Sequence, residues 1–202
     1  MTGRSAGAKR PGVYTTSYLL TAAAIAAATA ILLTAGTWLG YATLGVPWVN
    51  GVTLGLWTLP FAVALRLLPV PGTAVLVAVF AGIVMIPFQP DTFRAIVVNL
   101  WYAFFFELVF AVTLYRIRRT WLFLVGGVVN GAIWGVTQAL AIDAAAMEPW
   151  VLVATVLIPT ASSVLGAWLG VVIADGLITR GVGRTTRKRL EQRRAAEVAV
   201  GE

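Results

Sequence analysis

The chain contains no cysteine and no histidine. Without cysteine it can form no disulfide, no thiolate nucleophile and no iron–sulfur site. Without histidine it lacks the commonest general base and metal ligand of proteins. These absences argue against a membrane enzyme. We predict no catalytic residue, no cofactor and no metal site.

Charged residues are also scarce, at 11% of the 202 residues, whereas 59% are hydrophobic. That balance is typical of a protein that crosses a membrane several times. The net charge of +7 could suggest a nucleic-acid partner. Nearly every basic residue, however, lies just beyond the end of an apolar run, where it fixes membrane topology. We therefore expect a lipid bilayer around the chain and no nucleic acid.

Six apolar runs approach or exceed the ~20 residues that a helix needs to cross a bilayer. They span roughly 17–40, 47–67, 72–88, 95–115, 121–141 and 150–178. We predict an all-α integral membrane protein with a six-helix transmembrane domain over residues 17–178 and basic tails over 1–16 and 179–202. The first run is longer than a signal-peptide core, so a retained helix is favoured over a cleaved signal.

The basic residues predict the orientation of this domain. Fourteen of the fifteen fall in the two tails, at Arg66 where the second run ends, or in the segment 116–119. Only Arg94 lies on the other side. Cytoplasmic loops carry the excess of Lys and Arg, so both termini are predicted in the cytoplasm. For the C-terminal tail, a solvated topology anchor is favoured over a surface helix that attracts anionic lipid.

Alanines recur every four residues in the first apolar run. Ala22, Ala26 and Ala30 share one helical face, with Ala23 and Ala27 beside them. In lipid the hydrophobic effect does not drive helices together, and small residues allow the close approach that does. We predict that this face receives another helix. The spacing leaves open which helix that is.

Polar residues within the fourth and fifth runs predict a pocket. They are Asn99, Tyr102 and Glu107 in the fourth run, and Asn130, Trp134 and Gln138 in the fifth. Counting residues from one membrane side places Glu107 level with Asn130, and Asn99 level with Gln138. Two stripes of amides and aromatic rings favour a pocket for a small, polar, partly aromatic solute. The alternative is that the amides only bond neighbouring helices.

Two carboxylates need partners in this arrangement. Glu107 is the only acidic residue deep in a run, where a charge is costly, so it should be paired or protonated and face the protein interior or a water-filled cavity. Asp175, near the inner end of the last run, is predicted to pair with nearby arginines.

Several segments together resemble a known family. They are the alanine face, Gly55-Leu56-Trp57, Pro71-Gly72-Thr73-Ala74, Glu107-Leu108-Val109-Phe110-Ala111, and Ser163 to Gly176 followed by the basic tail. With six helices, cytoplasmic termini and no ATP-binding motif, the chain resembles the substrate-capture (S) component of an energy-coupling factor (ECF) vitamin transporter. It is most similar to the thiamine/hydroxymethylpyrimidine-type family.

The resemblance implies a multi-pass protein of the bacterial plasma membrane that serves as the substrate-binding subunit of an ECF-type ABC importer. The alanine face would dock on a transmembrane (T) subunit driven by two ABC ATPase subunits. The outer halves of the last three helices, the first loop and Trp57 would hold the vitamin. Members of this type carry acidic residues in the third helix, whereas residues 76–86 here have none. That departure favours a neutral pyrimidine over a cationic thiazolium and leaves Glu107 to accept the aminopyrimidine edge.

Two other functions stay open at this point. One is a stand-alone secondary transporter of a small aromatic solute, which the lack of an evident inverted repeat disfavours. The other is a ligand-free membrane scaffold, in which the polar stripes would serve helix packing alone.

Overall fold

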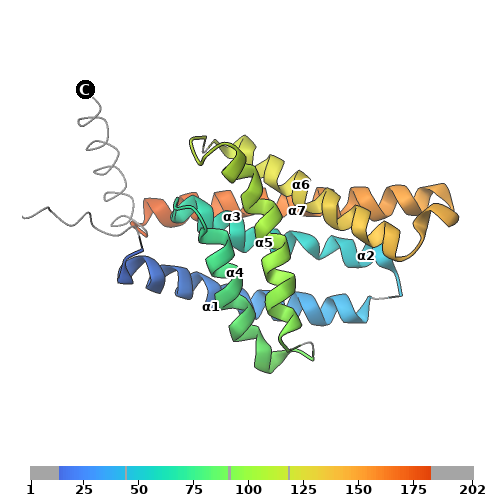
Figure 1. The fold of residues 1–202 in the computed structure, drawn as a ribbon, viewed down its shortest axis with the longest axis horizontal. Coiled ribbons are helices and arrows are strands. Elements are labelled where there is room, and N and C mark those ends of the chain that lie inside the picture. The colour runs from blue at the N-terminus through green and yellow to red at the C-terminus, as the bar shows by residue number, and fades with distance from the viewer. Residues whose placement is uncertain (1–13, 44, 91, 118, 183–202) are drawn as a thin grey trace, which may run out of the picture.

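The computed structural model describes residues 14–43, 45–90, 92–117 and 119–182, and within them the chain forms helices and turns but no strand. The predicted all-α class is thus confirmed (Figure 1). The elements are α1 (Thr16–Ala42), α2 (Pro47–Val52), α3 (Leu54–Leu67), α4 (Thr73–Met85), η1 (Ile86–Phe88), α5 (Arg94–Val112), α6 (Thr120–Ala141), η2 (Ala144–Ala146) and α7 (Pro149–Thr179).

Five stretches of the described chain are long and apolar enough to cross a membrane. They are residues 16–42, 48–67, 94–112, 120–141 and 149–179, and a shorter apolar stretch covers 73–88. The predicted runs match these bounds to within a few residues. A sixth crossing through 73–88 and the orientation stay predictions. Most of each predicted basic tail lies outside the described residues.

Local sequence signals set where several helices begin. The Thr15 side chain accepts a hydrogen bond from the Tyr18 backbone N–H and caps α1. Pro149 occupies the first turn of α7, where its missing N–H costs nothing. Gly72 precedes α4 with a φ of 80°, a left-handed conformation that favours glycine over residues with a side chain.

Helices α6 and α7 pack against each other through glycines spaced every four residues. A Cβ added to Gly127, Gly131 or Gly135 would lie 2.9, 2.5 or 2.8 Å from the Cα atoms of Val164, Thr160 and Val156, respectively. No such atom fits, so these glycines are required for the contact. The opposite numbering shows that the two helices are antiparallel, with backbones as close as small residues permit.

Helices α3 and α7 run side by side in the same direction. The Gly55 N–H donates to the Ser162 hydroxyl at 2.9 Å, and Gly170 lies against Ala62 about two turns further along. A side chain at Gly166 would collide with the Gly55 backbone. The α3–α7 pair therefore forms a second close helix contact on the other side of α7.

The alanine face of α1 packs inside this chain. Ala22, Ala26 and Ala30 are at most 1% exposed, and α1 packs on α4. At one end of this contact the Tyr18 and Thr73 hydroxyl oxygens lie 2.9 Å apart. The spacing correctly predicted a helix-packing face, but the helix is α4 of the same chain. As a surface for a partner, these three alanines are therefore a wrong choice, whereas Ala23 and Ala27 are exposed.

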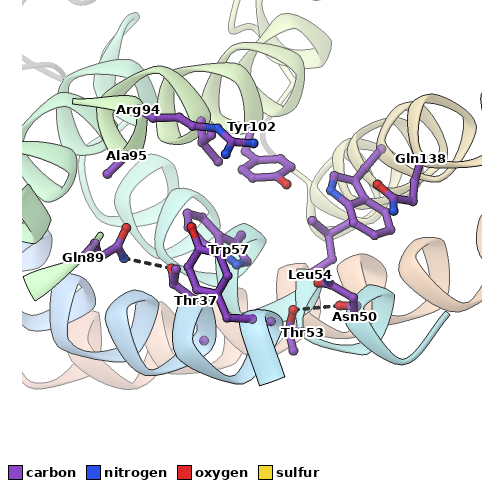
Figure 2. Close-up of a pocket in the computed structure, with 15 residues that line it drawn as sticks. Thr37, Asn50, Thr53, Leu54, Trp57, Gln89, Arg94, Ala95, Tyr102 and Gln138 are labelled. Carbon is purple, nitrogen blue, oxygen red and sulfur yellow. Dashed lines mark hydrogen bonds between the residues drawn. The ribbon is translucent and has the colours of Figure 1, made fainter. Parts of the chain in front are cut away.

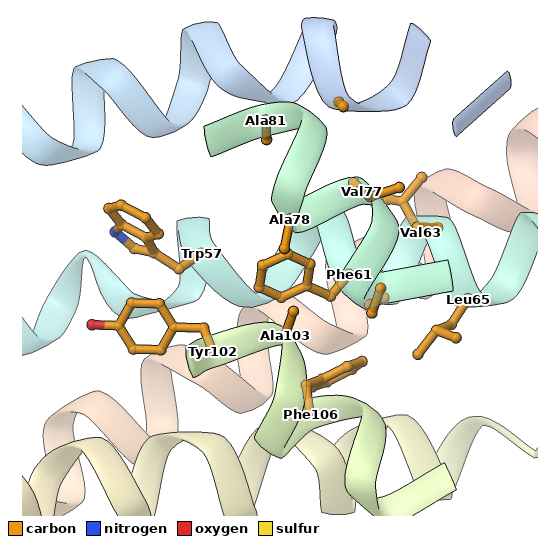
Figure 3. Packing of buried hydrophobic residues seen from close by; sticks show 14 of the residues in the cluster. Trp57, Phe61, Val63, Leu65, Val77, Ala78, Ala81, Tyr102, Ala103 and Phe106 are labelled. Atoms are coloured by element: carbon orange, nitrogen blue, oxygen red, sulfur yellow. The ribbon is translucent and has the colours of Figure 1, made fainter. Parts of the chain in front are cut away.

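Helices α4 and α5 cross the long axis of α1 and α7 at a steep angle (Figure 1). The crossing is filled by small and aromatic residues from three helices, among them the fully buried Phe61, Ala78 and Ala103 (Figure 3). This core separates two regions of different character. On one side of it lies a cavity, and on the other lies a buried carboxylate.

Candidate functional site

A cavity of about 360 Å³ lies among α1, the α2–α3 segment, the turn after η1, α5 and α6 (Figure 2). Its lining includes four aromatic residues: Tyr41, Trp57, Tyr102 and Trp134. Its volume is within the range of small-molecule sites, and its lining combines aromatic surface with a few polar groups, as such sites do.

The aromatic wall is held in place by its own contacts. The Trp57 and Tyr102 rings lie 5.4 Å apart between centroids, tilted by 48°. The Trp134 side chain completes this wall of the cavity. Trp57 and Tyr102 are each less than 10% exposed. The rings therefore present a preformed apolar surface to whatever occupies the cavity.

One side of the cavity is tied to α1 by two hydrogen bonds. The Gln89 side-chain amide donates to the Thr37 hydroxyl at 2.8 Å, and the Trp38 indole donates to the Phe88 carbonyl at 3.2 Å. Together they fix the turn between α4 and α5 against the end of α1. Gln89 therefore lines the cavity with its amide nitrogen already donating to α1.

Two other lining amides are not engaged. The side chains of Asn50 on α2 and Gln138 on α6 form no hydrogen bond with any residue that the structure describes. The Asn50 amide is packed toward α1, with its oxygen 3.5 Å from where a Cβ on Gly40 would lie. Gln138 follows Trp134 by one helical turn on the same face of α6. Both amides retain their hydrogen-bonding capacity for a ligand or water.

Arg94 is the one charged side chain among the lining residues that the structure describes. It begins α5 and extends toward Tyr102 (Figure 2). From sequence, Arg94 is only the exception to the charge asymmetry, and it was not predicted as a site residue. Its isolation from the other basic residues was the one signal that could have drawn attention to it. No aspartate or glutamate occurs among the described lining residues.

The structure brings four of the seven predicted binding residues together at this cavity: Trp57, Tyr102, Trp134 and Gln138. The other three, Asn99, Glu107 and Asn130, lie elsewhere. Each of these is less than 5% exposed and bonded within the protein. Their assignment to the pocket is therefore corrected.

Asn130 and Asn99 bond to their own surroundings. The Asn130 amide donates to the Thr58 hydroxyl at 3.1 Å, and the Thr58 and Ser163 hydroxyl oxygens lie 2.7 Å apart, which links α6, α3 and α7. The Asn99 amide donates to the Ala95 carbonyl at 2.8 Å and lies 3.4 Å from the Met85 sulfur. The Asn130 amide thus serves helix packing, whereas the buried Asn99 Oδ1 has no hydrogen-bond partner among the described residues.

Glu107 belongs to a polar group on the far side of the core, here called the carboxylate cluster: Glu107, Tyr115 and the backbone N–H groups of Gly72 and Val75. Oε1 accepts from Gly72 N–H at 2.6 Å and from the Tyr115 hydroxyl at 2.8 Å, and Oε2 accepts from Val75 N–H at 3.1 Å. The two N–H groups belong to the start of α4, where a negative charge is stabilised. Glu107 thus secures the α4 start to α5.

Tyr115 completes this cluster from the segment after α5. Burial and the hydrogen bond to Glu107 raise the pKa of the Tyr115 hydroxyl. It therefore remains a protonated donor to the carboxylate. A carboxylate with three donors needs no ligand to satisfy it.

Residue counts along α5 and α6 did not predict depth, because the two helices are not parallel (Figure 1). Counting residues along each helix gives comparable depths only when the helices run side by side. Here α5 crosses the bundle steeply, so residues with equal counts on α5 and α6 lie in different regions (Figure 1). Phe106 of α5 lies against Gly126 of α6, and the Phe110 and Phe123 rings meet at 4.7 Å.

The prediction for Asp175 is confirmed. Its carboxylate receives two hydrogen bonds from Arg66, Nε to Oδ1 at 2.8 Å and Nη2 to Oδ2 at 3.0 Å. The guanidinium also lies 5.8 Å from the centre of the Phe123 ring. This ion pair joins the ends of α3 and α7.

Comparison with known proteins places these features in a family. Residues 18–133 match the family described as "ABC-type cobalt transport system, permease component". A solved structure described as "Crystal structure of an S-component of ECF transporter" is similar in fold, with a TM-score of 0.74 and 20% sequence identity. The similarity covers 91% of this chain and 98% of that one. No curated protein sequence matches. The chain thus has an S-component fold, and by its match over more than half its length it belongs to the ABC-type cobalt transport system permease family.

Proposed function

We propose that this protein is the membrane-embedded substrate-capture subunit of an ECF-type ABC importer. The observation that carries the proposal is the aromatic cavity, which combines preformed rings with two unengaged amides in an S-component fold. A ligand-free scaffold would have no need of such a space. A stand-alone transporter would work without partner chains, so transport measured in their absence distinguishes it from the proposed capture subunit.

For the solute, we propose thiamine or its hydroxymethylpyrimidine moiety. The rings of Trp57, Tyr102 and Trp134 offer stacking surface for a planar heterocycle. The described lining contributes Arg94 and no carboxylate, which supports the neutral pyrimidine over the cationic thiazolium. Glu107 takes no part in this proposal, because its oxygens are bonded at the α4 start.

A second candidate solute is cobalt, which the family description names. Co²⁺ in proteins favours imidazole and other nitrogen, sulfur or carboxylate ligands. The sequence has no histidine or cysteine, and the described residues hold no cluster of metal-ligating side chains. The donor set around the cavity, amides and hydroxyls beside aromatic rings, supports an organic solute instead.

The partners in this proposal are a T subunit and two ABC ATPase subunits. For docking we propose the exposed side of α1, where Ala23 and Ala27 lie next to the buried alanine face. Small side chains would let a partner helix approach closely in lipid. Both termini in the cytoplasm and six crossings complete the proposal. Helix α7 runs antiparallel to α6 and parallel to α3. Six successive crossings, made by α1, the α2–α3 segment, α4, α5, α6 and α7, would give these two directions, which supports that count.

The test is to purify the protein alone in detergent, denature it and identify released small molecules by mass spectrometry. We expect a stoichiometric pyrimidine or thiamine-like compound. Where the protein is purified empty, hydroxymethylpyrimidine or thiamine should raise its melting temperature, and Co²⁺ should not. A protein that carries no such compound and is not stabilised by either would contradict the proposed solute.

A further inference from the structure

The polar groups of the cavity differ in whether they are already used. Thr53 donates to the Asn50 carbonyl at 2.8 Å, and the Gln89 side-chain nitrogen donates to the Thr37 hydroxyl at 2.8 Å. These hydrogen bonds shape the cavity and use part of the capacity of each side chain. The side-chain amide of Gln138 is different, since it lines the cavity and has no partner among the described residues.

The Gln138 amide lies next to the aromatic surface of Trp134. The two residues are one turn apart on the face of α6 that meets the cavity, and Figure 2 shows the Gln138 amide at the cavity lining. A planar ring that stacks on the Trp134 indole and reaches one turn along α6 would meet the Gln138 amide with its edge. The amide is therefore placed to form hydrogen bonds with that edge.

A carboxamide carries a donor and an acceptor in one plane. It matches a ring edge with an acceptor nitrogen beside an exocyclic amine, as in the pairing of Gln or Asn with adenine. An aminopyrimidine has the same edge. A carboxylate has two acceptors and could make only one of these bonds to the neutral ring. The amide is thus the better partner for an uncharged aminopyrimidine.

We infer that Gln138 is the specificity-determining residue of the cavity and that its amide pairs with the donor–acceptor edge of a neutral planar heterocycle. This inference rests on the proposed function, in which that heterocycle is the pyrimidine of the captured solute. Asn50, packed toward Gly40, is not part of it. Gln138 replaces Glu107 in the role that the sequence resemblance assigned to the carboxylate.

The experiment compares two probes of similar shape on the purified protein. Hydroxymethylpyrimidine has the edge, and para-methylbenzyl alcohol lacks both ring nitrogens and the amine. Affinities are measured by quenching of tryptophan fluorescence for the wild type, Gln138→Leu and the control Thr137→Val. Thr137 is the neighbouring residue of α6, is exposed and does not line the cavity, and its hydroxyl bonds only the backbone carbonyl of Trp134.

We expect Gln138→Leu to weaken hydroxymethylpyrimidine binding about 10- to 100-fold, the range for loss of a bidentate amide–base pair. Its affinity for para-methylbenzyl alcohol should change little, and Thr137→Val should resemble the wild type for both probes. A merely structural role for Gln138 would lower both affinities together.

Two results would overturn the inference, and they are distinguishable. If the wild type binds hydroxymethylpyrimidine and Gln138→Leu binds it equally well, or loses both probes equally, the edge-reading role is wrong while the proposed function stands. If the wild type binds neither hydroxymethylpyrimidine nor thiamine, the proposed solute is wrong and the inference fails with it.

Discussion

The cavity and the carboxylate cluster use polar residues in opposite ways. At the carboxylate cluster every oxygen of Glu107 is bonded by the protein, with donors at 2.6, 2.8 and 3.1 Å. At the cavity the Asn50 and Gln138 amides have no partner among the described residues. In a membrane, an unsatisfied polar group is expensive unless water or a ligand reaches it. The comparison indicates that the cluster stabilises the fold and that the cavity is available for binding.

One of the two largest effects on stability is expected from the carboxylate cluster. Glu107→Gln replaces one acceptor oxygen with an NH₂ group that faces backbone donors, which should lower the free energy of unfolding by about 2 kcal/mol. Thermal unfolding in detergent measures this loss. Ligand affinity per folded molecule should stay unchanged.

The matched control is Glu148→Gln, because Glu148 is exposed and its side chain forms no capping hydrogen bond. It should unfold like the wild type. Weakened ligand binding by Glu107→Gln at unchanged stability would reverse the assignment of the two regions.

The packed side of α1 offers a second comparison, between neighbouring alanines. Ala26 is 0% exposed, so Ala26→Leu overfills the α1–α4 contact and should cost about 1–3 kcal/mol of stability. Ala27→Leu projects outward and should leave stability and ligand affinity unchanged. Co-purification with the T subunit should fall for Ala27→Leu. If the complex forms normally with that variant, the exposed alanines are not the docking surface.

The aromatic wall should show the opposite pattern from Glu107. Trp134→Leu removes a stacking surface and should weaken ligand binding about 10-fold, by analogy with the stacking of bases on aromatic rings. Stability should change by less than about 1 kcal/mol, since Trp134 is only partly buried. Trp121→Leu, on an exposed part of the same helix, is the control for tryptophan loss. Equal binding by both variants would remove Trp134 from the site.

The smallest effect is expected at the Arg66–Asp175 pair. The two side chains are 24% and 47% exposed, so solvent screens the pair, and Asp175→Asn should cost at most about 1 kcal/mol. Unfolding of the variant in detergent tests this, with Asp143→Asn as the control at an exposed turn. A loss as large as that of Glu107→Gln would make the pair a principal support of the fold.

Sequence patterns predicted the individual helices better than the packing and the angles between them. Hydropathy located the helices, and the spacing of four placed Trp134 and Gln138 together on one face of α6. These are properties of one helix, fixed by its period. The angle between helices is set by packing along their whole length, such as the glycine contacts of α6 with α7. Depth counting could not include that angle, so it placed Glu107 and Asn99 in the pocket.

Charge and small-residue patterns had a similar limit. Arg94 stood out only because it is predicted on the membrane side opposite the other basic residues. Nothing in the sequence around it indicated a cavity. Alanine spacing predicted a close helix contact at Ala26, but composition does not distinguish α4 of the same chain from a helix of a partner. Both distinctions depend on tertiary contacts between distant segments.

Hydrogen–deuterium exchange of the purified protein with and without hydroxymethylpyrimidine tests the central claim most directly. The account predicts that the solute slows exchange around Asn50, Gln89 and Gln138 and leaves exchange around Gly72 and Tyr115 unchanged. Protection centred on Gly72 and Tyr115, with none at the cavity, would contradict it and make the carboxylate cluster the binding site.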